Sequence, residues 1–244
     1  MRRQFRDVKK GGLPVLIRKC LVVPLLAVAI PIVLILRALR PVVLVRFGRL
    51  KSLSIGMFAA ATELYLCERD AGLHPKRTID ISSCDDRISN QQLKKMWARE
   101  LHIFFWLGRI LERANNLLPG SAPHRIPLPN DQDYHGMIPR SRMHLSFTAK
   151  EERLGQAGLQ SLGLPEGAPF VCLHARDMEY KGGDTGHEWS AHLNQDERLH
   201  GYRNTSISNY VPAAEELVQR GYFVIRMGAV VNEPLKTTNP MIID

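Results

Sequence analysis

Short apolar runs alternate along most of the chain with longer stretches of helical spacing, and this alternation predicts an α/β fold. Runs rich in β-branched and aromatic residues predict strands at 41–47, 79–84, 170–177, 222–227 and 241–243. Turn residues follow most of them. Strands that alternate with helices in this order are typical of a parallel sheet built from crossover units.

The clearest helix predictions come from apolar residues three and four positions apart. The longest is a single helix over 91–118. A second covers 149–163, where Thr148 as N-cap and Glu151 three residues later form a capping box. A third covers 209–219, behind a serine N-cap.

The order of elements predicts two Rossmann-like halves. The strand at 41–47 is followed by Gly48, which we expect in a tight turn, and by a helix that ends near Leu66. Strand, glycine turn and helix in this order open a Rossmann-like half. We expect three parts: a basic and apolar membrane anchor at 1–40, a first half at 41–164 and the start of a second half at 165–244.

The second half contains too few strands to bury a core of its own. A parallel sheet of two or three short strands cannot cover both of its faces. We therefore expect a partner chain or, preferably, a longer protein of which this chain is the N-terminal portion.

Residues 20–36 form an apolar run without a charged residue. The run lies at the short limit for a spanning helix, which needs about 20 residues, and Pro24 and Pro31 interrupt it. A helix that lies in the cytoplasmic leaflet fits best, because both basic flanks then stay on one side. A spanning helix, a signal peptide and a buried core helix are alternatives. We expect the chain at the cytoplasmic face of the inner membrane.

The formal charge of +9 is concentrated around this apolar run. Basic residues on both flanks favour anionic lipid head groups over nucleic acid as the partner, and no nucleic-acid-binding motif is present. The flanking residues are Arg2, Arg3, Arg6, Lys9, Lys10, Arg18, Lys19, Arg37, Arg40, Arg46, Arg49 and Lys51. The four cysteines are scattered without metal-ligand spacing, which indicates reduced thiols.

The strand that begins at Phe170 ends abruptly in the polar residues His174, Arg176 and Asp177. In open parallel sheets, ligands bind outside the carboxyl ends of the strands. An arginine placed there can hold a diphosphate through two parallel hydrogen bonds. From spacing alone, a structural Arg-Asp ion pair is an equally good interpretation.

Further candidates for binding a diphosphate come later in the chain. Arg203 and Asn204 lie just before the helix predicted at 209–219, and an arginine beside a helix N-terminus favours an anion. Arg226 and Gly228 come from the end of the next predicted strand.

Candidate general bases lie near the same strand end. His174 can act as a base, donate a hydrogen bond to a phosphate or be structural. Asp177 can orient the neighbouring arginine or cap a turn. Glu179 is the first of several carboxylates in a glycine-rich segment, and spacing does not distinguish it from the others. The histidines of that segment fit no standard ligand pattern, so we expect no metal.

Seven segments carry a combined signature. They are Val45–Leu50, Thr62–Glu68, Asn90–Leu93, Met96–Arg99, Phe170–Asp177, Tyr202–Asn204 and Gly221–Gly228. Together they resemble a family of bacterial glycosyltransferases linked to surface polysaccharide synthesis, over a stretch from about Arg46 to Asp244. Members of that family are similar in turn to fucosyltransferases of the GT-B type.

The resemblance implies a GT-B-like fold in which a His-x-Arg segment opens the second Rossmann-like half. It places contact with the nucleotide diphosphate on Arg176, with His174 beside it. It also implies a nucleotide-sugar donor as substrate, with no metal or other cofactor. Two features depart from the family. Gly56-Met57-Phe58 stands where members often have Gly-His-Leu, and members continue well past Asp244.

We therefore expect the N-terminal portion of a membrane-associated glycosyltransferase. It would move a sugar from a nucleotide-sugar to a glycan or lipid-linked acceptor, and this chain alone is expected to be inactive. The alternative is a non-catalytic, membrane-peripheral binding protein on an α/β scaffold, and nucleotide binding distinguishes the two. A membrane-anchored hydrolase of phosphate esters is a third interpretation, which predicts metal dependence.

Overall fold

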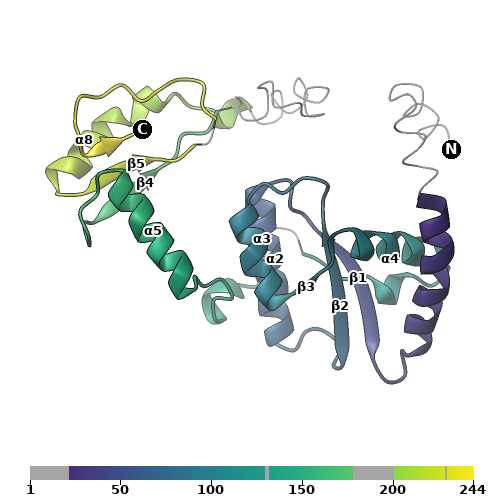
Figure 1. The fold of residues 1–244 in the computed structure, drawn as a ribbon. Helices are drawn as coiled ribbons and strands as arrows, with labels where there is room; N and C mark the ends of the chain where they lie inside the picture. Colours follow the sequence, from purple (N-terminus) through teal and green to yellow (C-terminus); the bar gives the residue numbers. More distant parts are fainter. Residues whose placement is uncertain (1–21, 130–131, 178–200, 229) are drawn as a thin grey trace, which may run out of the picture. The chain divides into compact units, whose positions relative to one another are not determined.

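The computed structural model shows a mixed α/β chain that divides into two compact units (Figure 1). It describes residues 22–129, 132–177, 201–228 and 230–244. Unit 1 comprises Met1–Phe147 and unit 2 comprises Thr148–Asp244. The expected α/β class is confirmed. The division follows Phe147, so that the helix at 149–161 is grouped with unit 2 and the apolar segment with unit 1.

Unit 1 is built around a three-stranded parallel sheet of order β1-β2-β3. The strand predicted at 79–84 is confirmed as β2. The elements in chain order are a helix over 22–38, β1 (Leu44–Leu50), α2 (Ile55–Asp70), β2 (Thr78–Cys84), α3 (Gln91–Glu100), β3 (His102–Ile103) and α4 (Phe105–Leu117).

Helices cover both faces of this sheet (Figure 1). The core beneath α2 and α3 contains Leu50, Phe58, Tyr65, Leu66, Cys84, Leu93, Trp97, Leu101 and Ile126. The core beneath helix 22–38 and α4 contains Ala29, Val33, Val45, Phe47, Ile110, Leu111 and Ala114. Strand β1 therefore contributes apolar side chains to both cores, Leu50 to the first and Val45 and Phe47 to the second.

The single helix expected over 91–118 is wrong, because a short strand divides it. Leu101 ends α3 in an extended conformation, and residues 102–103 pair with β2 before α4 begins. Trp97 lies in one core and Ile110 in the other. The apolar periodicity continues because both helices are amphipathic, but they cover opposite faces of the sheet, which one straight helix cannot do.

Gly48 lies inside β1 and not in the expected turn. The backbone of residues 125–126 runs alongside this strand: Phe47 and Arg125 form a parallel bridge, and the N–H of Ile126 donates to the carbonyl of Phe47 at 3.0 Å. A Cβ on Gly48 would lie only 2.7 Å from the Cβ of Ile126. Glycine is therefore required here by close packing and not by a turn.

Replacing Gly48 with Ala is expected to lower the free energy of unfolding by about 1–3 kcal/mol, because the added methyl overpacks a rigid contact. Chemical denaturation followed by circular dichroism measures this change. Gly56→Ala is the matched control, since a Cβ on Gly56 meets nothing within 4 Å. That variant should be unchanged or more stable by up to about 1 kcal/mol. Equal stability of the two variants would contradict the packing explanation.

Helix 22–38 packs one apolar stripe on unit 1 and exposes another. Ala29 and Val33 are buried in the core beneath it. A neighbouring stripe, which we call the outer stripe, consists of residues of the helix and the residue just after its end, and all five side chains are exposed: Leu25, Val28, Ile32, Ile35 and Leu39. Within the part of the chain that the structure describes, no helix has both the length and the apolar character needed to cross a membrane.

Arg37 fastens this helix to the end of α4. Its guanidinium donates to Oδ1 of Asn115 at 2.7 and 3.0 Å and to the carbonyls of Asn115 and Pro119 at 2.8 and 2.7 Å. A cation at a helix C-terminus satisfies carbonyls that have no partner within the helix. Arg37 is therefore a structural clamp.

Two more of the basic residues expected at lipid head groups also form ion pairs within unit 1. Arg46 pairs with Asp80, and Arg49 pairs with Glu112 at 2.8 Å. The side chains of these two residues and of Arg37 thus have partners within unit 1, and an anionic lipid surface as partner of the chain stays a prediction. An intramolecular partner several dozen residues away in sequence cannot be recognised from charge clustering alone.

Unit 2 contains a second parallel sheet, of order β4-β5-β6. The capping box of Thr148 and Glu151 is confirmed at the start of the first helix. The elements are α5 (Ala149–Ser161), β4 (Phe170–Leu173), the 3-10 helix η5 (Ile207–Tyr210), α8 (Val211–Gln219), β5 (Phe223–Arg226) and β6 (Ile242–Ile243).

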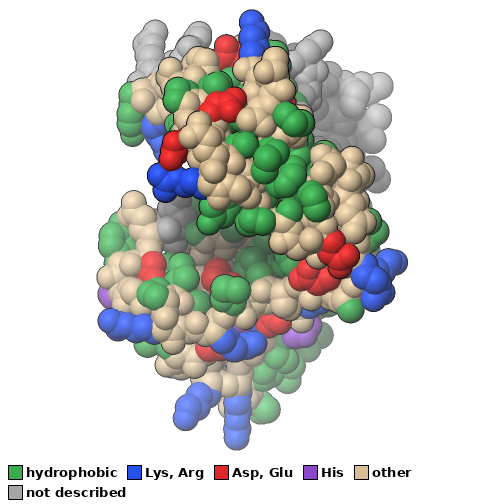
Figure 2. All heavy atoms as spheres, turned by 90° about the vertical axis from the view of Figure 1, so that its left-hand side faces the viewer, with side chains coloured by type: hydrophobic (Ala, Val, Ile, Leu, Met, Phe, Trp, Pro, Cys, Tyr) green, Lys and Arg blue, Asp and Glu red, His purple; other side chains and the backbone are tan. Residues whose placement is uncertain are grey.

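One face of this sheet is covered and the other is partly open. The core beneath α8 contains Ile207, Ala214, Val224, Leu235 and Ile242. On the other face of β4, Phe170 is 41% exposed and Cys172 is also exposed. Figure 2 shows hydrophobic side chains gathered on the surface of unit 2. This open face is in line with the expectation that two or three short strands cannot cover both faces of their sheet.

Candidate functional site

The carboxyl edge of the sheet in unit 2 brings together most of the predicted site residues. Because β4, β5 and β6 are parallel, their carboxyl ends lie at one edge. His174, Arg176 and Asp177 follow β4, and Gly228 comes two residues after β5. This edge is the usual ligand position in open α/β sheets.

The segment at 203–205 lies against the end of β4. The N–H of Thr205 donates to the carbonyl of Arg176 at 2.9 Å, which places Asn204 beside this arginine. The side-chain Oδ1 of Asn204 is buried and has no hydrogen-bond partner among the described residues. The structure thus unites two predicted binding segments that are separated in sequence by the undescribed residues 178–200.

Among the described residues, Arg176 and Arg203 are two arginines of this edge whose guanidinium groups have no internal partner. Neither guanidinium forms a hydrogen bond or ion pair with the residues that the structure describes, and each side chain is at least partly exposed. An arginine without an internal partner is available to an anion from solution. Nearby, the hydroxyl of Ser206 accepts from the N–H of Ser208 at 3.2 Å and caps η5, which leads into α8.

Arg226 has a different environment. It is buried, and its Nη1 donates to the carbonyl of Glu233 at 2.5 Å and to Oδ1 of Asp244 at 3.0 Å. The second oxygen of Asp244 accepts from the N–H of Leu235 at 2.9 Å. These bonds hold the loop after β5 against β6. Because Nη1 of Arg226 already donates to two internal oxygens, Arg226 has fewer N–H groups available to a ligand than Arg176 has.

The remaining predicted residues with a described position are Asp177, Gly228 and His174, and each has a different environment. Oδ2 of Asp177 accepts from the N–H of Asn232 at 3.0 Å. A Cβ on Gly228 would lie 2.6 Å from Val231, so this glycine permits close loop packing. His174 has no hydrogen-bond partner within the described ranges. Glu179, the third predicted base, lies outside the described residues.

Unit 1 contains a buried ion-pair network that sequence analysis did not identify. Nε and Nη2 of Arg46 donate to the two oxygens of Asp80 at 2.7 and 3.0 Å, and Nη2 also donates to the hydroxyl of Tyr65 at 2.8 Å. The Tyr65 hydroxyl donates to Asp80 in turn. Burial and this bond to Asp80 raise the pKa of Tyr65, so it stays a neutral donor.

A cavity of about 330 Å³ lies beside this network, near the amino ends of the strands. Arg69, Lys76 and Arg77 contribute cations to its lining, and Glu100 contributes a carboxylate. Its position is at the opposite edge from the carboxyl ends of β1 and β2. The cavity is therefore distinct from the ligand position that the fold favours.

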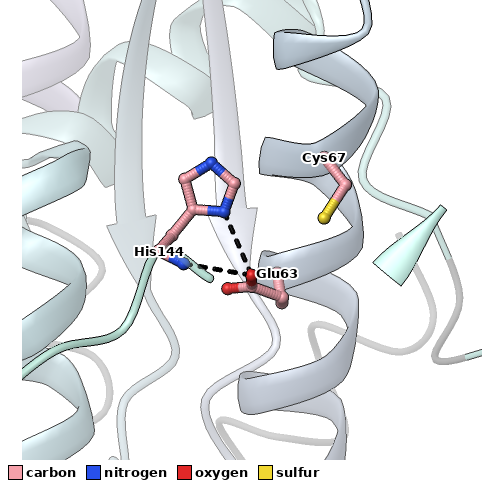
Figure 3. A group of neighbouring side chains, drawn as sticks. All are labelled: Glu63, Cys67 and His144. Atoms are coloured by element: carbon pink, nitrogen blue, oxygen red, sulfur yellow. Dashed lines mark hydrogen bonds and ion pairs between the residues drawn. The ribbon is translucent and has the colours of Figure 1, made fainter. Parts of the chain in front are cut away.

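A second missed group lies on α2 and the segment at 142–147. Glu63, Cys67 and His144 bring one ligand atom each to within 4.8 Å of one another (Figure 3). Nδ1 of His144 lies 3.0 Å from Oε1 of Glu63, and its Nε2 lies 3.2 Å from Oδ2 of Asp70. Burial raises the pKa of the Cys67 thiol. The i, i+4 spacing of Glu63 and Cys67 is visible in sequence, but their proximity to His144 is not.

Compared with protein-family models, curated proteins and solved structures, the chain has no significant match. The family resemblance of the short segments therefore stays a prediction.

Proposed function

We propose that this chain belongs to a membrane-associated, GT-B-like glycosyltransferase of surface polysaccharide synthesis. The donor would be a nucleotide-sugar, and the acceptor a glycan or lipid-linked sugar. One observation carries the proposal: at the carboxyl edge of a parallel sheet, the guanidinium of Arg176 has no hydrogen-bond or ion-pair partner among the described residues, and the hydrogen bond from Thr205 holds Asn204 beside this arginine.

The chemistry follows from the charge that develops during sugar transfer. The acceptor oxygen forms a bond to the anomeric carbon, the bond from that carbon to the diphosphate breaks, and the diphosphate leaves with its electron pair. Arg176 and Arg203 would balance this negative charge, which needs no metal. His174 is the described base best available to take the acceptor proton, since Asp177 is anchored to the loop at Asn232. Glu179 remains a further candidate for this role.

Nucleotide binding by the complete protein tests this proposal. Calorimetric titration with uridine, guanosine and cytidine diphosphates should find one that binds, and Arg176→Ala should weaken it at least about tenfold. A hydrogen bond to a charged group contributes about 1.5–3 kcal/mol, and about 1.4 kcal/mol corresponds to a factor of ten. Arg153→Ala is the control, because Arg153 is an exposed arginine on α5 of the same unit.

Two results would contradict the proposal. Equal affinity of Arg176→Ala and the original protein would remove Arg176 from the site. A complete protein that binds none of the nucleotides would favour the alternative of a non-catalytic, membrane-peripheral binding protein.

The outer stripe supports the membrane part of both interpretations. Five apolar side chains spaced three or four residues apart form an exposed band on helix 22–38. A helix that is apolar on all sides needs cover on all sides. The basic residues that precede it in sequence favour an anionic lipid surface, which we propose to be the cytoplasmic face of the inner membrane.

A further inference from the structure

The group formed by Glu63, Cys67 and His144 combines three different metal-binding chemistries in a largely buried place. Cys67 and His144 are buried, and Glu63 is partly buried. Figure 3 shows the sulfur of Cys67 directed toward the space between the imidazole and the carboxylate. Thiolate, imidazole and carboxylate are the three ligand types found around zinc.

The distances suit a zinc ion after small side-chain adjustments. Zinc bonds of about 2.0–2.3 Å place neighbouring ligand atoms roughly 3.3–3.8 Å apart in a tetrahedron. Here Nδ1 of His144 and Oε1 of Glu63 are 3.0 Å apart, and all three ligand atoms lie within 4.8 Å of one another. Glu63 and Cys67 come from successive turns of α2, so the helix itself sets their spacing.

A buried oxygen of Glu63 without a hydrogen-bond partner gives independent support for a cation at this position. Oε2 of Glu63 is buried and has no hydrogen-bond partner among the described residues. A buried carboxylate oxygen without a partner is costly, and a bound cation removes that cost. The other oxygen of Glu63 already accepts from the backbone N–H of His144 at 3.2 Å.

A metal-bound histidine usually donates its other ring N–H to a carboxylate, carbonyl or water, and Asp70 provides such an acceptor for His144. Nε2 of His144 lies 3.2 Å from Oδ2 of Asp70, so Nδ1 faces the other ligands while Nε2–H donates to a carboxylate. Asp70 also accepts from Nε of Arg142 at 3.0 Å. The charges then balance: Glu63 and the Cys67 thiolate neutralise a divalent ion, and Asp70 pairs with Arg142.

We propose that Glu63, Cys67 and His144 bind one zinc ion, which clips the segment at 142–147 to α2. Water would hold the fourth position. Binding releases the proton of the Cys67 thiol and joins the sulfur to the metal. This site is in unit 1 and is independent of the proposed transfer reaction, for which we expect no metal.

Metal titration of the complete, chelator-treated protein tests the proposal. Elemental analysis should find one tightly bound zinc per chain, and cobalt in its place should give a thiolate-to-cobalt absorption band in the near ultraviolet. Cys67→Ser should lose the band and the tight site. Asp70→Asn should weaken zinc about 10–100-fold, as expected for a residue that orients a ligand. Cys172→Ser, which removes an exposed thiol, should change neither.

Absence of both zinc uptake and the cobalt band in the original protein would overturn the proposal, whether or not the variants fold. His144 would then be an ion-pair partner of Glu63 and Asp70 only. Zinc uptake that is equal in the original protein and in folded Cys67→Ser would also overturn it, because the metal would then be bound elsewhere.

Discussion

Replacing Asp80 with Ala is expected to destabilise unit 1 by about 3–5 kcal/mol, enough to leave a marginally stable domain substantially unfolded. Asp80 is the partner of Arg46 through two hydrogen bonds, and both side chains are almost completely buried. Without Asp80, the buried Arg46 guanidinium keeps its charge and, among the hydrogen-bond partners within the described residues, retains the Tyr65 hydroxyl. The cost is that of an uncompensated buried charge.

Urea denaturation followed by circular dichroism measures this effect. A double variant, Arg46→Met with Asp80→Leu, should recover most of the lost stability, because apolar side chains can replace a buried ion pair. Glu216→Ala is the control for a surface pair, since Arg220 and Glu216 are both exposed, and it should cost less than about 1 kcal/mol. If Asp80→Ala is as mild as Glu216→Ala, the buried network does not contribute to stability as argued.

Replacing Ile35 with Asp is expected to reduce binding to anionic phospholipid vesicles at least about tenfold. Burying an aliphatic side chain of this size contributes about 1.5–3 kcal/mol, and an aspartate adds repulsion from the lipid head groups. Val28→Asp should have a similar effect, because both residues belong to the outer stripe. Vesicle flotation with the complete protein measures the bound fraction.

Leu73→Asp is the matched control for this experiment. Leu73 and Ile35 are equally exposed, at 63% each, but Leu73 lies outside the outer stripe. The control should bind vesicles like the original protein, and binding should fall as salt is raised if the basic residues take part. Vesicle binding that survives Ile35→Asp and Val28→Asp would exclude the outer stripe as the membrane surface.

Local signals in the sequence predicted most of the secondary structure. The apolar run at 79–84 covers all but the first residue of β2, the runs at 170–177 and 222–227 contain β4 and β5, and the capping box at Thr148 starts α5. These features depend on residues within one or two turns of each other. Side-chain shape and local hydrogen bonding are therefore sufficient to predict them.

Other features depend on which face of a sheet an element covers. The apolar spacing over 91–118 is genuine, but the two helices within it pack in different cores, and only the pairing of β3 with β2 separates them. The chemistry of glycine alone predicts a turn at Gly48, whereas the residue lies within β1. Its actual role depends on Ile126, a residue far away in the chain.

The candidate sites show the same division. The position of Arg176 after a buried-type strand was visible in the sequence, and its place at the carboxyl edge follows from parallel pairing. That Arg176 is uncommitted while Arg226 pairs with Asp244 was not visible, because both are arginines at strand ends. The zinc-type group was equally hidden, since His144 lies about 80 residues beyond Glu63 and Cys67.

The amino-acid sequence by itself thus determined the α/β class, the main strands, the capped helices and the apolar N-terminal run. Tertiary structure alone decided which basic residues are engaged, which apolar stripe stays exposed and which polar groups meet. The physical reason is the separation in sequence over which each kind of interaction acts. Propensity and periodicity act between neighbours along the chain, whereas ion pairs, close contacts and ligand clusters join residues that only folding brings together.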